Sequence, residues 1–450
     1  MASVRQLISY FASVPFIRTV ATMQITTAIN VVVGFASSIV YIRLLGLELF
    51  GILAVVYAFS GLLSIPASFG QDTALVTFFS EAVGGKDTHK AKAVLWYFLQ
   101  STVLSTVMYV VLGIIAPSLA TVWQSNGEIG HYARYVFANQ ALQGPAVLLF
   151  LGLQIERKLK LLSLVENART ILQFAITTVM LMLNMGIMAI LLGTLIISII
   201  YVPICLFLYE RLAKNGGKMP RLTSLIRSGK SSTKAYFLQG LMMTLDRSIA
   251  SNLHPNIFIM MIASISTEMA GVLRLALRLA YLPTSLLLPS ITRTASVSLP
   301  KLIAQDRKAL KSSVLKLLTG CIILSIILVV GGEIVIPPLI PIVYGKEFIS
   351  TQGPFMILII STIFISLNVI TVPLLRTYKK LHVSIINFLV GILIGVALFF
   401  VLIKFMSPIL AVSIGIVYVH AHSLLMYPYL WISLRNSPTG SLEHSAQSEA

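Results

Sequence analysis

Two arginines lie in the middle of an apolar segment, "GVLRLALRLAYL", at residues 271–282. Arg274 and Arg278 are four residues apart, so on an α-helix their side chains lie on one face. An arginine at the centre of a bilayer costs about 2.5–3.5 kcal/mol on insertion scales, yet its planar donors suit phosphate oxygens. The pair therefore predicts either a functional cationic site or a buried ion pair.

An acid in the preceding apolar segment could neutralise this charge: Asp246, with Arg247 beside it. Counted at 1.5 Å per helical residue from opposite sides of a bilayer, Asp246 is expected roughly 18 Å deep and the two arginines roughly 9 and 15 Å deep. One acid cannot neutralise three arginines. The excess charge favours a cavity lined by Arg247, Arg274 and Arg278 over structural pairing with Asp246 or an error in the assumed helix register.

A second candidate surface is "HYARYVFANQALQGPA", which begins at residue 131. Arg134, Tyr135, Asn139 and Gln143 combine aromatic faces and amides, which suit sugars. The alternative is that the tyrosines anchor the outer membrane boundary while the amides make ordinary interhelical contacts. The sequence leaves both interpretations open.

The histidines and cysteines do not predict a metal site. His420 and His422 are two residues apart and therefore lie on different helix faces, which favours local polar packing. Cys205 and Cys321 fall inside apolar segments without partner spacing. We therefore expect no metal, cofactor or disulfide.

Composition predicts an all-α integral membrane protein. Hydrophobic residues make up 57% of the chain and charged residues only 11%, well outside the norms of soluble proteins. Stretches of about 20 apolar residues, each long enough to span a bilayer, indicate about 12 transmembrane helices. They lie near 19–41, 48–70, 93–115, 131–153, 167–184, 187–209, 234–263, 268–291, 314–341, 352–375, 382–403 and 408–433.

Lysine and arginine alternate in density between the two ends of these segments, as the positive-inside rule requires. The sparse side holds only Arg43, Arg134, Lys346 and Lys404. The rich side includes both ends of the chain, so both termini are predicted to be cytoplasmic. The net charge of +18 follows largely from this asymmetry and needs no nucleic-acid partner.

The longest polar connection divides the chain into halves of similar size. We expect a six-helix bundle at 1–210, a basic cytoplasmic linker at 211–234, a second six-helix bundle at 235–435 and a disordered cytoplasmic tail at 436–450. The other loops are short, which leaves no room for a soluble catalytic domain.

The halves also contain a weak repeat. The segment "LELFGILAVVYAFSGLLSIPASFG" is similar to "TEMAGVLRLALRLAYLPTSLLLPS". Glu268 follows Glu48 by 220 positions, and Gly271 follows Gly51 by the same number. Six spans return the chain to its starting side, so the repeat is parallel, with two bundles around a central cavity. That cavity is expected to be lined by spans one, two, seven and eight, an architecture that suits alternating access.

These stretches carry a family resemblance. With "YIRLLGLELFGILAVVYAFSGLLSIPASFGQDTAL", "TLDRSIASN", "EMAGVLRLALRLAYLP" and "SLPKLIAQD", the chain resembles the polysaccharide transporter family, the Wzx-type O-antigen flippases of the multidrug, oligosaccharidyl-lipid and polysaccharide exporter superfamily. The resemblance implies a MATE-like fold of two six-helix bundles in the bacterial cytoplasmic (inner) membrane. It also implies alternating-access translocation of a polyprenyl-pyrophosphate-linked oligosaccharide for O-antigen, capsule or exopolysaccharide biosynthesis.

On this reading the protein is not an enzyme, and Arg274, Arg278 and Arg247 meet the pyrophosphate. Its partners are a lipid-linked oligosaccharide, membrane lipids and other polysaccharide-assembly membrane proteins. A cation-coupled multidrug exporter is one alternative, but "TVATMQITTAINVVVGFASSIVY" lacks the buried carboxylate expected for it. A membrane-embedded polysaccharide-synthesis enzyme is another, although no acid/base or metal constellation is visible.

Overall fold

The computed structural model describes residues 15–67, 78–79, 88–124, 127–156, 158–214, 221, 234–249, 253–285, 307–377 and 380–429. Within these ranges the side chains of 15–27 and of some further helical residues, Arg247 among them, are not described. The structure does not describe the predicted tail, residues 436–450. It also leaves out nearly all of the predicted linker 211–234 beyond Lys214.

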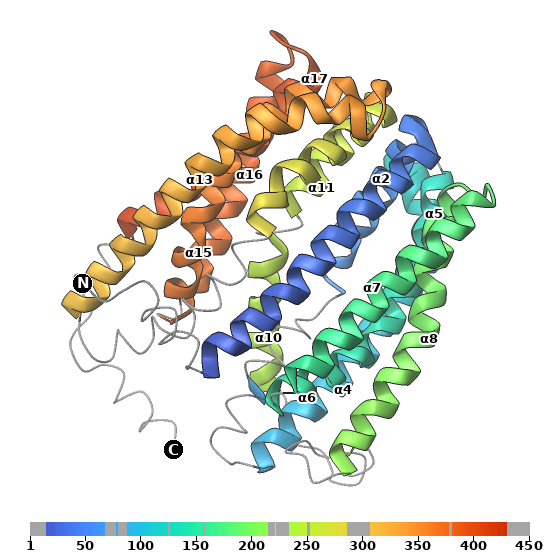
Figure 1. Ribbon diagram of the computed structural model, residues 1–450, viewed down its shortest axis with the longest axis vertical. Coiled ribbons are helices and arrows are strands. Elements are labelled where there is room, and N and C mark those ends of the chain that lie inside the picture. The colour runs from blue at the N-terminus through green and yellow to red at the C-terminus, as the bar shows by residue number, and fades with distance from the viewer. Residues whose placement is uncertain are drawn as a thin grey trace.

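The described chain is helical and contains no strand (Figure 1). The first half comprises α2 (Pro15–Ser64), α4 (Thr88–Gln124), α5 (Gly127–Gln143), η1 (Gly144–Ala146), α6 (Val147–Ile155), α7 (Leu159–Met182) and α8 (Ile187–Lys214). The second half comprises α10 (Lys234–Ser248), α11 (His254–Ala263), a helix described over residues 267–285, α13 (Arg307–Val343), η3 (Lys346–Thr351), α14 (Gln352–Ile359), α15 (Ser361–Thr377), α16 (Leu381–Leu402), α17 (Pro408–His422) and η4 (Ser423–Leu425).

Helices occupy all twelve predicted apolar ranges. Among the described residues, seven helices are long and apolar enough to cross a membrane, or eight if the bent pair Lys346–Ile359 and Ser361–Asn368 is one span. The number is lower than twelve partly because α2 contains two predicted spans. Short α10 and α11 together fill the range of the seventh, and the eighth is described only to residue 285. The all-α membrane fold is confirmed.

The predicted repeat is visible in the helix boundaries. Inside α2 the backbone breaks at Gly46, whose φ of 74° lies in the left-handed region that favours glycine. The helix after that break starts at residue 47, and the corresponding helix of the second half starts at residue 267, again 220 positions later. Later in each half, α4 and α13 both have 37 residues.

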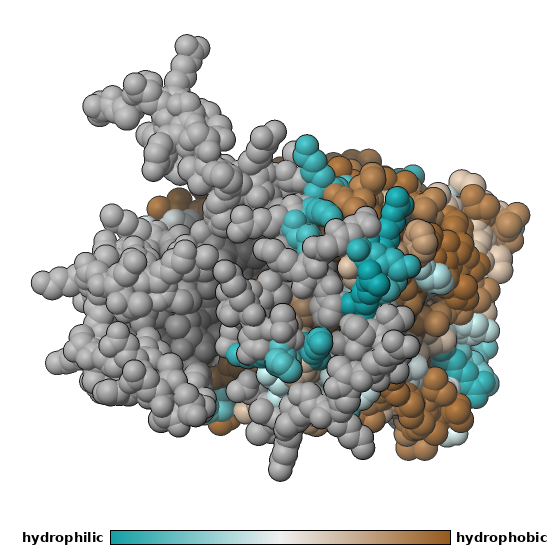
Figure 2. Space-filling view, turned by 90° about the horizontal axis from the view of Figure 1, so that it is seen from below, coloured by the Kyte–Doolittle hydropathy of each residue, from teal (hydrophilic) through white to brown (hydrophobic). Residues whose placement is uncertain are grey.

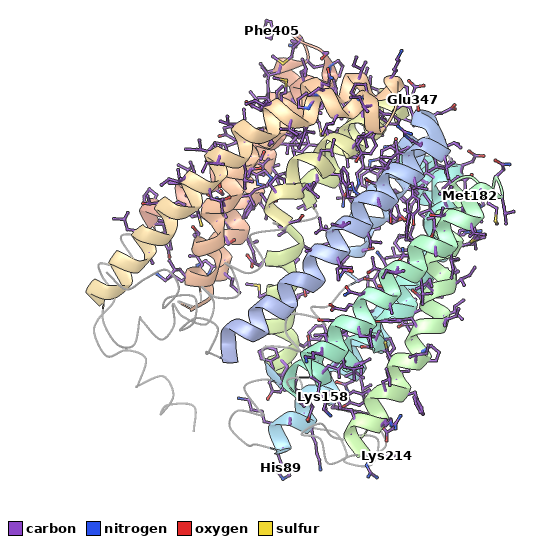
Figure 3. All side chains as sticks on the ribbon, viewed as in Figure 1. His89, Lys158, Met182, Lys214, Glu347 and Phe405 are labelled. Atoms are coloured by element: carbon purple, nitrogen blue, oxygen red, sulfur yellow. The ribbon has the colours of Figure 1, made fainter. Side chains whose placement is uncertain are left out.

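The two halves stand side by side and approach each other at one end. In Figure 1 helices α4 to α8 lie on one side, α13 and α15 to α17 on the other, and α2, α10 and α11 between them; the two sides converge at the top and diverge toward the bottom. Figure 3 places Lys158 and Lys214 at the lower end and Met182, Glu347 and Phe405 at the upper end. The labelled residues of the predicted cytoplasmic side therefore lie at one end, and those of the predicted outer side lie at the other.

Packing and surface agree with a lipid environment. One hydrophobic core joins the halves, with Phe59 from the first and Phe355 from the second, whereas a smaller core around Phe98 and Tyr209 belongs to the first half. Large apolar side chains such as Ile334 are exposed on the outside. Figure 2, viewed from the lower end, shows hydrophilic residues beside an apolar flank. An exposed apolar belt of this extent requires lipid contact.

Candidate functional site

Arg274 and Arg278, the arginines predicted to form the site, lie on the accessible stripe of an otherwise buried helix. From Ala270 to Ala280 every residue is buried except Arg274, which is half-buried, and Arg278, which is exposed. The two side chains share a face because they are one helical turn apart. The remaining faces of this segment are packed in protein, so the two arginines mark where it meets open space.

The open stripe faces the first half of the protein. Arg278 donates a hydrogen bond through Nη2 to the backbone carbonyl of Gly34, in the first part of α2. A Cβ built on Gly34 would make only an ordinary contact with this nitrogen, at 3.8 Å. A neutral carbonyl accepts one bond without cancelling the charge, so Arg278 spans the seam between the halves as a cation.

Three tyrosines surround the cationic stripe. Tyr41 and Tyr57 of α2 and Tyr344, which follows α13, lie within electrostatic range of Arg278, and Tyr57 is also within range of Arg274. Phenol hydroxyls therefore lie near both guanidinium groups.

The predicted pairing of Asp246 with these arginines stays a prediction. Asp246 is buried on α10, but among the described residues no carboxylate acts on Arg274 or Arg278. The alternative of structural pairing with Asp246 thus gains no support. The side chain of Arg247 lies outside the description, so its predicted role stays a prediction.

The glycines of the repeat meet at the seam. A Cβ on Gly271 would lie 2.9 Å from Gly51 Cα, and a Cβ on Gly51 would lie 2.2 Å from the carbonyl oxygen of Thr267. Equivalent residues of a two-fold repeat contact each other only near the axis. The Gly51–Gly271 contact therefore marks that axis, and Arg274 begins the next helical turn after it.

The span-four candidates make contacts within the first half. Asn139 Oδ1 accepts hydrogen bonds from Ser198 Oγ at 2.6 Å and from Gln143 Nε2 at 3.1 Å. Arg134 Nε donates to a carbonyl of α4 at 3.2 Å, and Tyr135 packs against the main core. None of these described contacts reaches the two arginines. The structure accommodates the packing interpretation, and a glycan-binding role stays a prediction.

Sequence reasoning missed the closure of the upper end. Arg43 donates from Nε to Val343 O at 2.6 Å and from Nη2 to Ile342 O. Ser38 Oγ and Tyr344 Oη lie 3.3 Å apart. Each contact joins α2 to the end of α13 or the residue after it, so the two halves are fastened together at the predicted outer end. The only sequence signal was the arginine before the second span, and nothing local identifies its distant partner.

The histidines also form contacts that their spacing did not indicate. His420 Nε2 lies 3.1 Å from His254 Nε2 and 2.9 Å from Tyr281 Oη, in agreement with the predicted polar packing. No group of three metal-ligating side chains occurs in the part of the chain that the structure describes.

Comparisons with known proteins agree with this architecture. The model of a family described as polysaccharide biosynthesis protein matches residues 40–352. No curated protein matches the sequence significantly.

Among solved structures, the chain is similar to a MOP superfamily transporter from Pyrococcus furiosus, with a TM-score of 0.69 at 13% identity over 93% of this chain and 95% of that one. That transporter is described as having a binding pocket of reverse polarity, which suggests a different function. An inward-facing multidrug resistance MATE family transporter has a TM-score of 0.69 at 15% identity, covering 92% and 94%. MATE in complex with MaL6 has a TM-score of 0.68 at 14% identity, covering 93% and 95%. The MATE-like fold is confirmed.

Proposed function

From the premise that this chain belongs to the polysaccharide biosynthesis protein family, with the fold of MOP superfamily transporters, we propose that it flips a lipid-linked oligosaccharide across a membrane. The cargo carries a pyrophosphate between a polyprenyl chain and a glycan. The membrane is the bacterial cytoplasmic membrane, and the product supplies surface polysaccharide such as O-antigen, capsule or exopolysaccharide.

The observation that carries this proposal is the pair Arg274 and Arg278 on the open stripe of a buried helix, where no carboxylate among the described residues acts on either arginine. A pyrophosphate leaving water must find cations and hydrogen-bond donors, or its transfer is prohibitively costly. Each guanidinium offers five N–H donors in a planar fork. Arg278 uses one described donor on Gly34, which leaves others for phosphate oxygens.

The surroundings of the arginines suit the rest of the cargo. The phenols of Tyr41, Tyr57 and Tyr344 can stack on sugar rings and hydrogen-bond their hydroxyls. The polyprenyl chain needs no protein route, since it is as apolar as the lipid beside it.

The closed upper end and diverging lower end support loading from the cytoplasmic side (Figure 1). In this proposal both termini are cytoplasmic, and the halves rock about the Gly51–Gly271 seam to expose the site outward. The positive charge of the stripe disfavours a cationic drug as cargo, because such a molecule would be repelled by Arg274 and Arg278.

The proposal is tested with the double variant Arg274→Gln/Arg278→Gln. Purified protein in nanodiscs is titrated with farnesyl pyrophosphate, and in cells the lipid-linked sugar remaining in the cytoplasmic leaflet is measured with membrane abundance. A hydrogen bond to a charged group contributes about 1.5–3 kcal/mol, so each lost arginine should weaken binding at least roughly tenfold. Lysine should restore binding only in part, because it lacks the planar fork.

Arg211→Gln/Lys214→Gln, at two exposed sites at the end of α8, is the matched control for loss of two positive charges. The double variant should keep normal abundance, because removing uncompensated cations also removes their desolvation cost. Unchanged binding and export at normal abundance would rule out the pyrophosphate role. Parallel loss of protein and export would instead assign the arginines a structural role.

A further inference from the structure

Aromatic side chains from both halves of the protein pack together near the upper end. Phe35 of α2 meets Tyr344 edge to face, with ring centroids 6.3 Å apart, and Phe50 meets Phe348 in the same way, at 6.4 Å. The rings of Tyr344 and Phe348 lie 6.5 Å apart. Phe348 is fully buried and Tyr344 is only 2% exposed. We call these four residues, together with Ser38, the outer gate.

One hydrogen bond crosses the outer gate, and a neighbouring contact fixes its direction. Ser38 Oγ donates to the carbonyl of Phe35 at 2.7 Å, so its hydrogen is already in use. Ser38 Oγ also lies 3.3 Å from Tyr344 Oη, and two hydroxyls attract only if one of them donates. Tyr344 is therefore the donor and Ser38 the acceptor. At this distance the bond between the two neutral groups is weak.

The same phenol lies near the proposed cargo site. Tyr344 and Arg278 are close enough to interact electrostatically. Gly34, whose carbonyl accepts a hydrogen bond from Arg278, precedes Ser38 by four residues. Arg278 and Tyr344 therefore contact α2 on adjacent turns of one helix.

We propose that Tyr344 is the latch of the outer gate, and that a pyrophosphate bound by Arg278 releases it by accepting the hydrogen that Tyr344 donates to Ser38. The inference rests on the proposed function, and it names the contact through which the cargo opens the outer side.

The exchange of partners is favourable because a phosphate oxygen is the better acceptor. Hydrogen bonds to an ionised acceptor are roughly twice as strong as those between neutral groups, and they are shorter. Tyr344 thus exchanges a long bond to a serine hydroxyl for a charge-assisted bond to the cargo.

Movement of the phenol also loosens the aromatic contacts between the halves. The ring of Tyr344 packs on Phe35 of the first half and on Phe348 of the second. A phenol that turns toward Arg278 cannot keep both contacts, so the loss of one hydrogen bond weakens the whole gate. A lipid without phosphate offers no competing acceptor and leaves the gate closed.

The latch is tested first without cargo, on protein in nanodiscs. Spin labels replace Met182 and Phe405, exposed residues of the first and second halves at the upper end, and electron–electron double resonance gives the distance between them. Tyr344→Phe and Ser38→Ala should each raise the ratio of open to closed molecules about fivefold. This factor corresponds to about 1 kcal/mol, the contribution of one hydrogen bond between neutral groups.

Two variants are matched controls for the lost hydroxyls. Tyr427→Phe removes a phenol that donates to the carbonyl of Leu367 at 2.6 Å, within the second half. Ser37→Ala removes a buried hydroxyl that donates to the carbonyl of Val33 at 2.7 Å, within α2. Both should keep the wild-type distance distribution, because neither hydrogen bond crosses between the halves.

The release step is tested by adding farnesyl pyrophosphate to the same samples. The wild type should open, whereas farnesol, which has the chain without the phosphates, should leave it closed. Tyr344→Phe should still bind farnesyl pyrophosphate through the arginines, but its ratio of open to closed molecules should no longer respond.

Ser38→Ala removes a single hydroxyl and provides the second variant if Tyr344→Phe impairs folding. A closed distribution in the folded latch variants without cargo would overturn the latch. Farnesyl pyrophosphate that binds the wild type without opening it, or that opens Tyr344→Phe by the same factor, would overturn the release step and leave the proposed function standing. Failure of farnesyl pyrophosphate to bind the wild type would overturn both proposals, so the two failures are distinguishable.

Discussion

Replacing Arg43 by glutamine should release the upper end of the transporter. Its guanidinium donates to the carbonyls of Ile342 and Val343, the last two residues of α13. The final carbonyls of a helix lack helical partners and carry the negative end of the helix dipole, so a cation is favoured there. Because Arg43 belongs to the first half and α13 to the second, these bonds exist only while the end is closed.

The size of the effect follows from the exposure of the side chain. A hydrogen bond from a charged donor contributes about 1.5–3 kcal/mol. Because Arg43 is exposed, solvent weakens these interactions, and we expect the two bonds together to contribute about 1.5 kcal/mol to the closed state. Since 1.4 kcal/mol corresponds to a factor of ten, the ratio of open to closed molecules should rise roughly tenfold in Arg43→Gln.

The measurement is the distance between spin labels at Met182 and Phe405, which both lie at the upper end (Figure 3). Arg134→Gln is the matched control, because Arg134 also donates to a helix carbonyl, that of Gly113, but within the first half. An unchanged distance distribution in Arg43→Gln would refute the reasoning, as would equal opening in the control.

Two further predictions concern packing within the fold. Gly51→Ala should lower thermal stability, by about 1–3 kcal/mol, because its Cβ would lie 2.2 Å from a backbone oxygen of Thr267; Gly331→Ala, whose Cβ meets nothing within 4 Å, should not. Asn139→Ala should cost about 1–3 kcal/mol of stability by leaving Ser198 without its acceptor, while cargo binding stays normal. Weaker binding at unchanged stability would instead assign Asn139 a role in glycan contact.

The helices and the repeat could be predicted from sequence because each depends on a pattern visible in the sequence itself. A span needs only about 20 apolar residues in a row, and a repeat needs only a constant offset. The shared face of Arg274 and Arg278 followed from helix geometry alone. The Gly51–Gly271 contact went further than the prediction, because two glycines equivalent by sequence proved to be neighbours in space.

Contacts between distant segments could not be predicted in this way. The spacing of His420 and His422 describes one helix, whereas the partner of His420 is His254, 166 residues earlier in the chain. In the sequence, Arg43 is only a charge at the end of a predicted span. Its contact across the two halves depends on where the end of α13 lies in three dimensions. Such pairs are set by how helices cross, which a single sequence does not encode locally.

The repeat relates the two arginines of the second half to an apolar stretch of the first. A shift of 220 positions places Arg274 and Arg278 opposite Ala54 and Ala58, which are buried in α2. The first half thus has small apolar residues where the second has cations. An arginine on both sides of the axis would place four uncompensated charges along one seam, at a cost that grows with each added charge.

The same shift places His254 opposite Gly34 and Tyr281 opposite Gly61. Gly61 provides space at the seam, because a Cβ built there would lie 2.4 Å from Nδ2 of Asn256, whereas a Cβ on Gly34 would make only an ordinary 3.8 Å contact with Nη2 of Arg278. A small residue in one half therefore accommodates a polar side chain from the other. This asymmetry places the two arginines on one side of the seam only.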